Sequence, residues 1–280
     1  MTVELFNKVC SDCSQSVTIS YSTSFSSAIK LLHKDLREPI FNIYGFVRFA
    51  DEIVDTFHGF DKQGLLAEFK KETFDAIDRG ISLNPILNSF QITVNQYNID
   101  HELIHAFFRS MESDLTEHQY DRQGYEEYIY GSAEVVGLMC LYVFCDGDQK
   151  MYEKLKQPAR ALGAAFQKVN FLRDIKADFN ELSRIYFPGC DFHNFTMTDK
   201  LQIEEDIAQD FAEAYRGILE LPLKARFGVY VAYKYYLSLF QKIKSIQPQF
   251  ILQRRVRIPN YHKAYIVFRA SVKNGLRLID

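Results

Sequence analysis

Four polar residues share one face of a helix that the apolar spacing predicts between Pro39 and Thr56. At 100° per residue they fall within about 40° of one direction, and their neighbours are apolar. They are Tyr44, Arg48, Asp51 and Asp55. A stripe of this kind points into a helix bundle, where carboxylates are destabilising unless they meet a cation. The pattern therefore predicts a buried site that combines acidic and cationic groups.

A second predicted helix, farther along the chain, carries a similar set of polar residues. Asp174 and Asp178 stand one turn apart on a face that they share with Gln167. Asn170 lies at the edge of this face, and Arg173 is displaced from it by about 100°. Two carboxylates one turn apart again accompany an arginine.

Two helices that face each other with paired carboxylates can hold Mg²⁺. This ion keeps several waters and usually takes one or two protein carboxylates, so phosphate oxygens of a substrate would complete its coordination. Arg48 and Arg173 can each contact phosphate oxygens in a bidentate manner. The residues therefore indicate a magnesium-dependent site for a diphosphate.

The same D-x-x-x-D spacing also occurs where no such site is expected. It arises by chance in a helical chain with 36 acidic residues, and most pairs of this kind lie on solvated faces. Asp206 and Asp210 have this spacing, but neither an arginine nor an apolar surround accompanies them. We expect this pair to lie on the surface.

A competing motif, H-E-x-x-H, is formed by His101, Glu102 and His105. Two histidines one helical turn apart with a glutamate between them are typical of a zinc metallopeptidase. Such a site needs a third ligand, and nothing singles out Glu126 or Glu127 for this role. A zinc peptidase is therefore the remote alternative to the diphosphate site.

The composition indicates one large, folded, helical domain over residues 1–280. The chain is 47% hydrophobic and 25% charged, which excludes intrinsic disorder and a transmembrane bundle. Only 13 glycines and 7 prolines interrupt it, so long helices are favoured. The net charge of −3 provides no general attraction for nucleic acid, and we expect no nucleic-acid partner.

Two further features bear on the location of the protein. Five cysteines are scattered in an odd set, which favours a reducing compartment over a disulfide framework. The longest strongly apolar run, Val135 to Cys145, is far shorter than the ~20 residues of a spanning helix. The expected location is therefore the cytoplasm, with peripheral contact at the inner face of the membrane as an extension of this prediction.

Apolar residues recur at three- and four-residue spacing in several long segments, and glycine, proline and asparagine fall between them. Helices are predicted over Pro39–Thr56, Leu65–Arg79, Asp100–Asp114, Tyr125–Cys145, Tyr152–Leu182, Lys200–Leu221 and Phe227–Ile246.

The motifs together resemble one enzyme family, the squalene and phytoene synthases, which condense isoprenyl diphosphates head to head. The resemblance holds in order and spacing over roughly residues 15 to 270. Within the family, the sequence is most similar to bacterial phytoene synthases. The resemblance rests on Tyr21–Phe25, on Tyr44, Arg48, Asp51 and Asp55, on Tyr128–Gly137, on Gln167–Asp178 and on Arg184–Pro188.

The resemblance implies an all-α isoprenoid synthase fold, a single helical bundle around a central apolar cavity. It also implies the reaction. One prenyl diphosphate ionises, its allyl cation adds to the double bond of a second molecule, and a cyclopropylcarbinyl diphosphate forms. This intermediate ionises in turn and rearranges to a 1-1′-linked hydrocarbon. A dry aromatic cavity would keep water away from these cations.

The resemblance also assigns roles to individual residues. Catalytic roles fall to Asp51, Asp55, Tyr128, Asp174 and Asp178, and Tyr128 is implied in the second half-reaction. The four aspartates and Asn170 are the implied metal ligands. The implied substrate-binding residues are Ser22, Ser24, Phe25, Tyr44, Arg48, Gln167, Asn170, Arg173, Tyr236 and Arg255.

The implied cofactor is Mg²⁺, with Mn²⁺ as a substitute, and NADPH is required only if squalene is the product. The implied substrates are two geranylgeranyl diphosphates that yield phytoene. Squalene or dehydrosqualene made from two farnesyl diphosphates is the alternative, and a helical scaffold without activity is a remote one. Because the product is insoluble in water, transient membrane association is expected. Glu134 departs from the family, which usually has glycine there.

Overall fold

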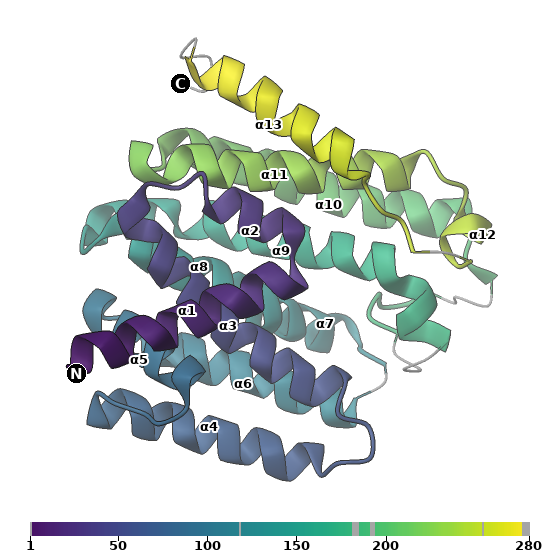
Figure 1. The fold of residues 1–280 in the computed structure, drawn as a ribbon. Coiled ribbons are helices and arrows are strands. Elements are labelled where there is room, and N and C mark those ends of the chain that lie inside the picture. The colour runs from purple at the N-terminus through teal and green to yellow at the C-terminus, as the bar shows by residue number, and fades with distance from the viewer. Residues whose placement is uncertain (1, 118, 181–184, 191–193, 254, 276–280) are drawn as a thin grey trace.

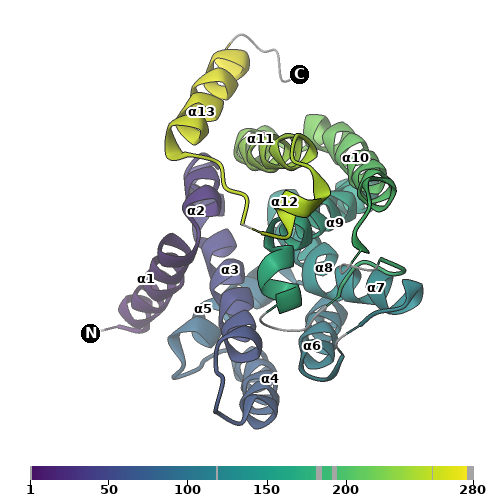
Figure 2. The same ribbon diagram turned by 90° about the vertical axis from the view of Figure 1, so that its right-hand side faces the viewer.

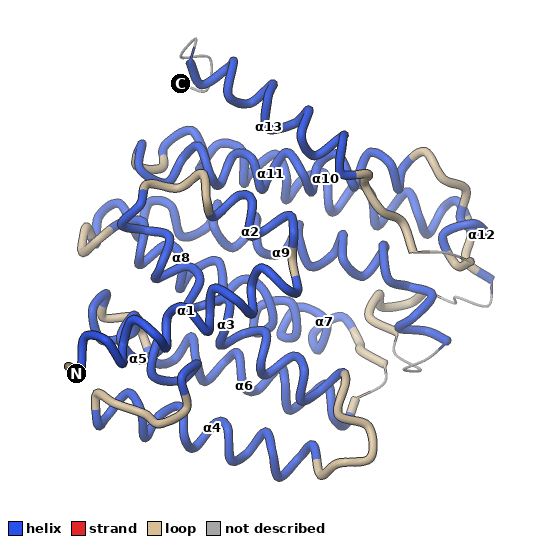
Figure 3. The backbone as a smooth tube through the Cα atoms, in the orientation of Figure 1, coloured by secondary structure: helices blue, strands red, loops and turns tan. Residues whose placement is uncertain are grey.

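The chain is folded into helices joined by short loops (Figure 1 and Figure 3). The computed structural model describes residues 2–117, 119–180, 185–190, 194–253 and 255–275, and the side chains of 177–180 and 275 lie outside this description. These described residues form no β-strand, and only Gln119 and Ile185 make an isolated bridge. The predicted all-α class is confirmed.

The helix predicted over Tyr125–Cys145 is interrupted, the other predicted helices are present, and unpredicted helices lie before, between and after them. The described residues form the following elements. They are α1 (Val3–Tyr21), α2 (Thr23–Ile29), α3 (Lys34–Asp55), α4 (Lys62–Arg79), α5 (Pro85–Tyr97), α6 (His101–Thr116), α7 (Arg122–Ile129), a π-helical turn η1 (Tyr130–Glu134), α8 (Val135–Cys145), α9 (Gln149–Asn180), α10 (Met197–Glu220), α11 (Leu223–Lys244), α12 (Pro248–Ile251) and α13 (Asn260–Gly275).

Local sequence explains several helix ends. The side chain of Asn84 accepts hydrogen bonds from the first backbone N–H groups of α5, and Pro85 occupies its first position. Gly80 ends α4 with a φ of 70°, a left-handed conformation that favours glycine. Thr196 and Asp199 form a reciprocal capping box at the start of α10.

The bundle is organised around two long helices, α3 and α9. Helix α9 packs against α8, α10 and α11, and α3 packs against α1, α5 and α8. Figure 2 shows α2, α3, α8, α9 and α11 arranged around the middle of the molecule. Below α3 lies a fully buried phenylalanine cluster in which the Phe46 and Phe90 rings stack at 3.8 Å. This cluster fixes α3 on α4, α5 and α6, so its polar stripe can face the opposite side.

The first helix packs through small and polar side chains. Cys10, Ser11, Ser14 and Thr18 are buried in α1, while several of its larger apolar residues are exposed. Ser14 lies so close to Gly45 of α3 that a Cβ at Gly45 would meet its Oγ at 2.7 Å. The two helices are therefore in close contact, which no larger residue at these positions would allow.

The chain from Arg122 to Cys145 is not one continuous α-helix. Five residues, Tyr130–Glu134, form a π-helical turn between α7 and α8, and the N–H of Val135 bonds to the carbonyl of Tyr130. Such turns occur often at functional sites. This stretch is also the one part of the described chain that is long and apolar enough to cross a membrane, but half of its most apolar window is buried in the bundle, as in a core helix.

Gly131 lets this turn approach α6, and we predict that Gly131→Ala destabilises the protein by about 1–3 kcal/mol. A Cβ at this position would lie 2.5 Å from the backbone oxygen of Ala106, which cannot move aside as a flexible side chain would. Thermal unfolding followed by circular dichroism measures the change. Gly80→Ala is not a suitable comparison because of its positive φ, whereas Gly124→Ala, whose nearest neighbours are side-chain atoms at 3.3 Å or more, should change stability less. Equal losses in the two variants would contradict the packing argument.

The prediction that Asp206 and Asp210 form a surface pair is wrong for Asp210, whereas the side chain of Asp206 is 39% exposed. Both carboxylates contact the ammonium of Lys168 in α9, at 2.6 and 2.7 Å, and the side chain of Asp210 is only 20% exposed. Burial raises the pKa of Asp210 to about 6, against the opposing effect of Lys168. The cation comes from a different helix, so the sequence around the pair carried no sign of it.

Candidate active site

A cavity of about 610 Å³ lies inside the bundle, between the two helices that carry the acidic stripes. Along both α3 and α9, apolar lining residues come first and polar ones follow toward the end of the helix. The apolar part is lined by Ile29, Leu32, Ile40, Ile43, Val136, Leu141, Phe144, Leu155, Leu162, Ile218, Leu221 and Val229. The cavity therefore offers a polar region joined to a long apolar one.

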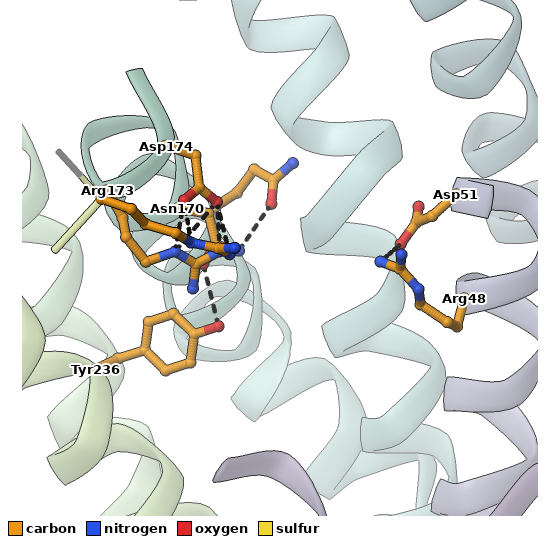
Figure 4. Close-up of polar contacts among 8 residues, drawn as sticks. Arg48, Asp51, Asn170, Arg173, Asp174 and Tyr236 are labelled. Atoms are coloured by element: carbon orange, nitrogen blue, oxygen red, sulfur yellow. Dashed lines mark hydrogen bonds and ion pairs between the residues drawn. The ribbon is translucent and has the colours of Figure 1, made fainter. Parts of the chain in front are cut away.

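The polar groups of α3 lie on one side of the cavity (Figure 4). Arg48 contacts Asp51 at 3.8 Å and forms a closer ion pair with Glu52. Its guanidinium carbon lies 4.4 Å from the centre of the Tyr21 ring. The Nε of Arg48 is buried and has no hydrogen-bond partner among the described residues. A buried donor without a partner is destabilising, so this guanidinium is suited to receive an anion.

Burial controls the protonation of this side of the cavity. It raises the pKa of Asp51 to about 7, and the neighbouring carboxylate of Asp55 adds to the rise while Arg48 opposes it. Burial also raises the pKa of Tyr44 to about 12, although a hydrogen bond with Ser22 counteracts it. A bound cation would therefore stabilise the ionised form of Asp51, which burial and Asp55 disfavour.

The polar groups of α9 lie opposite those of α3, as Figure 4 shows. The carboxylate of Asp174 is held by Nη2 of Arg173 at 2.6 Å and by Nε of Arg255 at 2.7 Å. The phenol of Tyr236 donates to Oδ1 of Asn170 at 3.2 Å, and the Asn170 amide donates to Gln167 at 3.4 Å. Two guanidinium groups, an amide and a carboxylate thus meet at one place.

Aromatic rings form the wall next to these polar groups. Phe25 lies 5.6–6.0 Å from the rings of Tyr44, Phe166 and Tyr236, and the last two stack at 3.9 Å. All four residues line the cavity. Their ring faces can stabilise a carbocation without reacting with it. Phe166 was not predicted as a site residue, although it directly precedes the predicted Gln167.

A buried carboxylate on α6, Asp114, forms a second cluster with three tyrosines. The phenol of Tyr128 donates to its Oδ2 at 2.6 Å, and those of Tyr186 and Tyr120 approach its Oδ1 at 3.3 and 3.5 Å. Asp114, Tyr128 and Tyr186 line the cavity, whereas Tyr120 does not. Burial and the charge of Asp114 raise the pKa of Tyr128 well above its ordinary value, so its phenol stays protonated.

The donors present fit Mg²⁺. Carboxylates of Asp51, Asp55 and Asp174 and the amide of Asn170 all line the cavity, and hard oxygen donors are the ligands that this ion prefers. Within the described residues, no three acidic, histidine or cysteine side chains are clustered closely enough to hold a metal ion by themselves. Each helix can thus supply only a few ligands, which suits an ion that also takes water and phosphate oxygens.

Most of the predicted site residues come together in this cavity. One prediction remains outside it, because Ser24 lies on α2 and does not line the cavity. The predicted Asp178 has its side chain outside the described residues. The predicted residues that line the cavity are Ser22, Phe25, Tyr44, Arg48, Asp51, Asp55, Tyr128, Gln167, Asn170, Arg173, Asp174, Tyr236 and Arg255.

Glu134 does not intrude on the cavity. Its carboxylate binds Nε of Arg160 at 2.5 Å, and the guanidinium of Arg160 also lies over the ring of Tyr130 at 5.2 Å. Glu134 is not among the lining residues, although the adjacent Ala133 is. The carboxylate that stands where the family usually has glycine is thus turned aside and paired.

The histidines of the H-E-x-x-H motif lie elsewhere. His105 stacks on Phe74 with the ring centres 4.2 Å apart, and Glu102 binds Arg109 at 2.7 Å. The described part of the chain brings no third ligand to these histidines. The geometry gives the zinc peptidase alternative no support.

Comparison with known proteins gives a consistent result. The family described as Squalene/phytoene synthase matches residues 19–262. The chain is 27% identical over 199 residues to a 4,4′-diapophytoene synthase of Staphylococcus haemolyticus, a match that covers 68% of this chain and 66% of that protein. It is also 27% identical over 247 residues to a phytoene synthase of Arthrospira platensis, covering 83% of this chain and 75% of the relative.

A solved structure shows the same fold. A dehydrosqualene synthase crystallised with a ligand superposes with a TM-score of 0.81 at 18% identity, over 96% of this chain and 98% of that one. The all-α bundle described above is therefore the fold of that enzyme.

Proposed function

The chain belongs to the squalene/phytoene synthase family, whose members condense prenyl diphosphates head to head, and from this premise we propose that it joins two geranylgeranyl diphosphates to phytoene. The observation that carries the proposal is the cavity, in which polar groups of two facing helices meet a long apolar region. A prenyl diphosphate has the same division between a charged head and an apolar tail. The choice of phytoene as the product is supported by the likeness to phytoene synthases.

The arginines bind and orient the departing diphosphate. Arg48 offers a buried Nε without a partner, and Arg173 and Arg255 release Asp174 when they turn to phosphate oxygens. Mg²⁺, when bound by the aspartates and Asn170, would supply positive charge to the leaving group. Three guanidinium groups that stabilise charge developing in the transition state favour ionisation of the C–O bond.

The aromatic wall protects the cation that ionisation leaves behind. Phe25, Phe166 and Tyr236 present ring faces beside the polar groups, and the apolar lining excludes water. The cation adds to the double bond of the second substrate, a proton is lost, and a cyclopropylcarbinyl diphosphate forms. In the second half, this intermediate loses its diphosphate, rearranges and releases another proton. Each phytoene thus leaves with two diphosphates and two protons.

Tyr128 is placed to act in the second half-reaction. Its phenol faces the cavity and is bonded to the buried carboxylate of Asp114. The phenol oxygen can accept the proton that the rearranging cation loses while the phenol passes its own proton to the carboxylate of Asp114.

The C15 substrate is the second candidate. It is supported by the likeness to a diapophytoene synthase and to the dehydrosqualene synthase structure. The reaction steps and the residues in them would be the same, because the two substrates differ only in the length of the apolar tail.

Product analysis tests the proposal. Purified protein with Mg²⁺ is given geranylgeranyl or farnesyl diphosphate separately, each with and without NADPH, and the products are separated and identified by mass spectrometry. We expect a C40 hydrocarbon that needs no NADPH, and loss of activity with a chelator that added Mg²⁺ restores. A C30 product would support the head-to-head condensation but show that farnesyl diphosphate is the substrate. The absence of product from both substrates would overturn the proposal.

A further inference from the structure

The last helix, α13, has an apolar stripe on the face that it turns away from the protein. Tyr261, Tyr265, Phe268 and Val272 are 77%, 53%, 67% and 45% exposed, at spacings of four, three and four residues. This spacing places them along one side of a helix. Figure 1 and Figure 2 show α13 at the edge of the bundle, with no described helix beyond it.

The opposite face of α13 is attached to the protein. Ile266, Val267 and Ala270 belong to or pack against the core, and α13 contacts α11. His262 bonds to Ser238 of α11 at 2.9 Å, and Lys263 donates to Thr23 of α2 at 2.8 Å. The helix is therefore fixed in place with its aromatic stripe directed outward.

The surroundings of the stripe are strongly basic. Residues 221–279 contain twelve Lys and Arg and not one Asp or Glu, whereas residues 1–220 contain 21 Lys and Arg against 35 Asp and Glu. Burial lowers the pKa of Lys234 of α11, and the nearby charges of Lys273 and Arg269 of α13 lower it further. Helices α2 and α12 also lack acidic residues. In a chain with a net charge of −3, residues 221–279, which include the exposed aromatic stripe, thus carry a net positive charge.

We propose that α13 and the basic surface around it dock the protein on an anionic lipid bilayer. Aromatic and aliphatic side chains flanked by Lys and Arg are typical of helices that lie in the membrane interface. Positive charge alone would suit several anions, but the row of exposed aromatic and aliphatic side chains needs an apolar medium. A second copy of this chain is disfavoured, because the same positive surface would meet itself.

The position of α13 connects this surface with the cavity. Thr23, the partner of Lys263, lies next to Ser22 and two residues from Phe25, which both line the cavity. A protein docked through α13 would thus hold its cavity near the bilayer, where apolar compounds collect. The docking itself does not depend on the proposed reaction, since it is measured without substrate.

Flotation with vesicles tests the inference, using the whole protein without substrate. We expect binding to vesicles of phosphatidylcholine mixed with phosphatidylglycerol, weaker binding to phosphatidylcholine alone, and a decrease with added salt. The double variant Tyr265→Ser/Phe268→Ser should bind the anionic vesicles at least about tenfold more weakly than the unchanged protein. Arg269→Gln and Lys273→Gln should each weaken binding to the anionic vesicles by roughly fivefold.

A matched control uses exposed apolar residues far from α13. Phe60 and Leu83 are 72% and 93% exposed in loops on either side of α4, and Phe60→Ser/Leu83→Ser should bind vesicles like the unchanged protein. Unchanged melting temperatures show that each variant is folded. Equal binding by the α13 variants and the control would overturn the inference. The inference would also be overturned if light scattering found the unchanged protein and the control to be dimers and only the α13 variants to be monomers, because this face would then join two copies.

Discussion

Replacing Asp51 by Asn should lower turnover by about two to three orders of magnitude without loss of folding stability. Asp51 lines the cavity opposite Asp174. In the proposed reaction it helps to bind the Mg²⁺ that would stabilise the departing diphosphate. An amide cannot supply the negative charge that attracts a divalent cation. Steady-state kinetics at saturating substrate and a titration of Mg²⁺ measure the effect, and the Mg²⁺ requirement should shift to higher concentrations.

The stability of the same variant should depend on pH in a defined direction. Because the pKa of Asp51 is raised from 3.8 to about 7 in the folded protein, ionising Asp51 destabilises the fold as pH rises between these values. Asn cannot ionise, so the metal-free variant should melt at a higher temperature than the unchanged protein at pH 8. At pH 4, where Asp51 is protonated in the folded protein, the difference should nearly vanish.

Asp206→Asn is the matched control for this experiment. Asp206 belongs to a pair with the same D-x-x-x-D spacing, but it binds Lys168 and does not line the cavity. Lys168 keeps Asp210 as a partner, so the variant should retain full turnover. Full turnover of Asp51→Asn, or an equal loss in both variants, would contradict the assignment of the α3 aspartates.

Periodicity predicted the long helices because their buried faces are apolar, and it failed where the buried face is not. Helix α1 buries Cys10, Ser11, Ser14 and Thr18 and exposes Val3 and other apolar residues, so the apolar pattern points to the wrong face. The π-helical turn after Tyr128 was also outside the reach of periodicity. It depends on the close approach of Gly131 to α6, which is a contact between distant parts of the chain.

The site was predictable where its residues repeat at helical spacing, and it was missed where they stand alone. The two acidic stripes could be found from spacing and a neighbouring arginine. Asp114 is a single carboxylate on α6, and only its position on a mostly apolar buried face distinguishes it. Its three tyrosine partners come from α7, from the loop before it and from the segment after α9. Long-range packing alone brings them together.

Replacing Tyr128 by Phe should slow the second half of the reaction and leave the first half nearly unchanged. The first half needs ionisation and addition, for which the arginines and the aspartates suffice. In the second half, we expect the lost phenol to slow the reaction by about 10²–10⁴-fold, the range for a positioned acid or base. The cyclopropylcarbinyl diphosphate should then accumulate. Rapid quenching followed by mass spectrometry measures both the intermediate and the hydrocarbon, and their ratio reports which half is affected.

Tyr120→Phe distinguishes a role of the cavity-facing phenol from a general loss of the cluster around Asp114. Tyr120 also approaches Asp114 and is also buried, but it does not line the cavity. Its loss should leave the ratio of intermediate to product unchanged, whereas Asp114→Asn, which weakens the acceptor of the Tyr128 phenol, should raise the ratio partway. If Tyr120→Phe and Tyr128→Phe changed the ratio equally, Tyr128 would serve only to pack the helices. A change confined to Tyr128 and Asp114 would place the proton transfer of the second half at this pair.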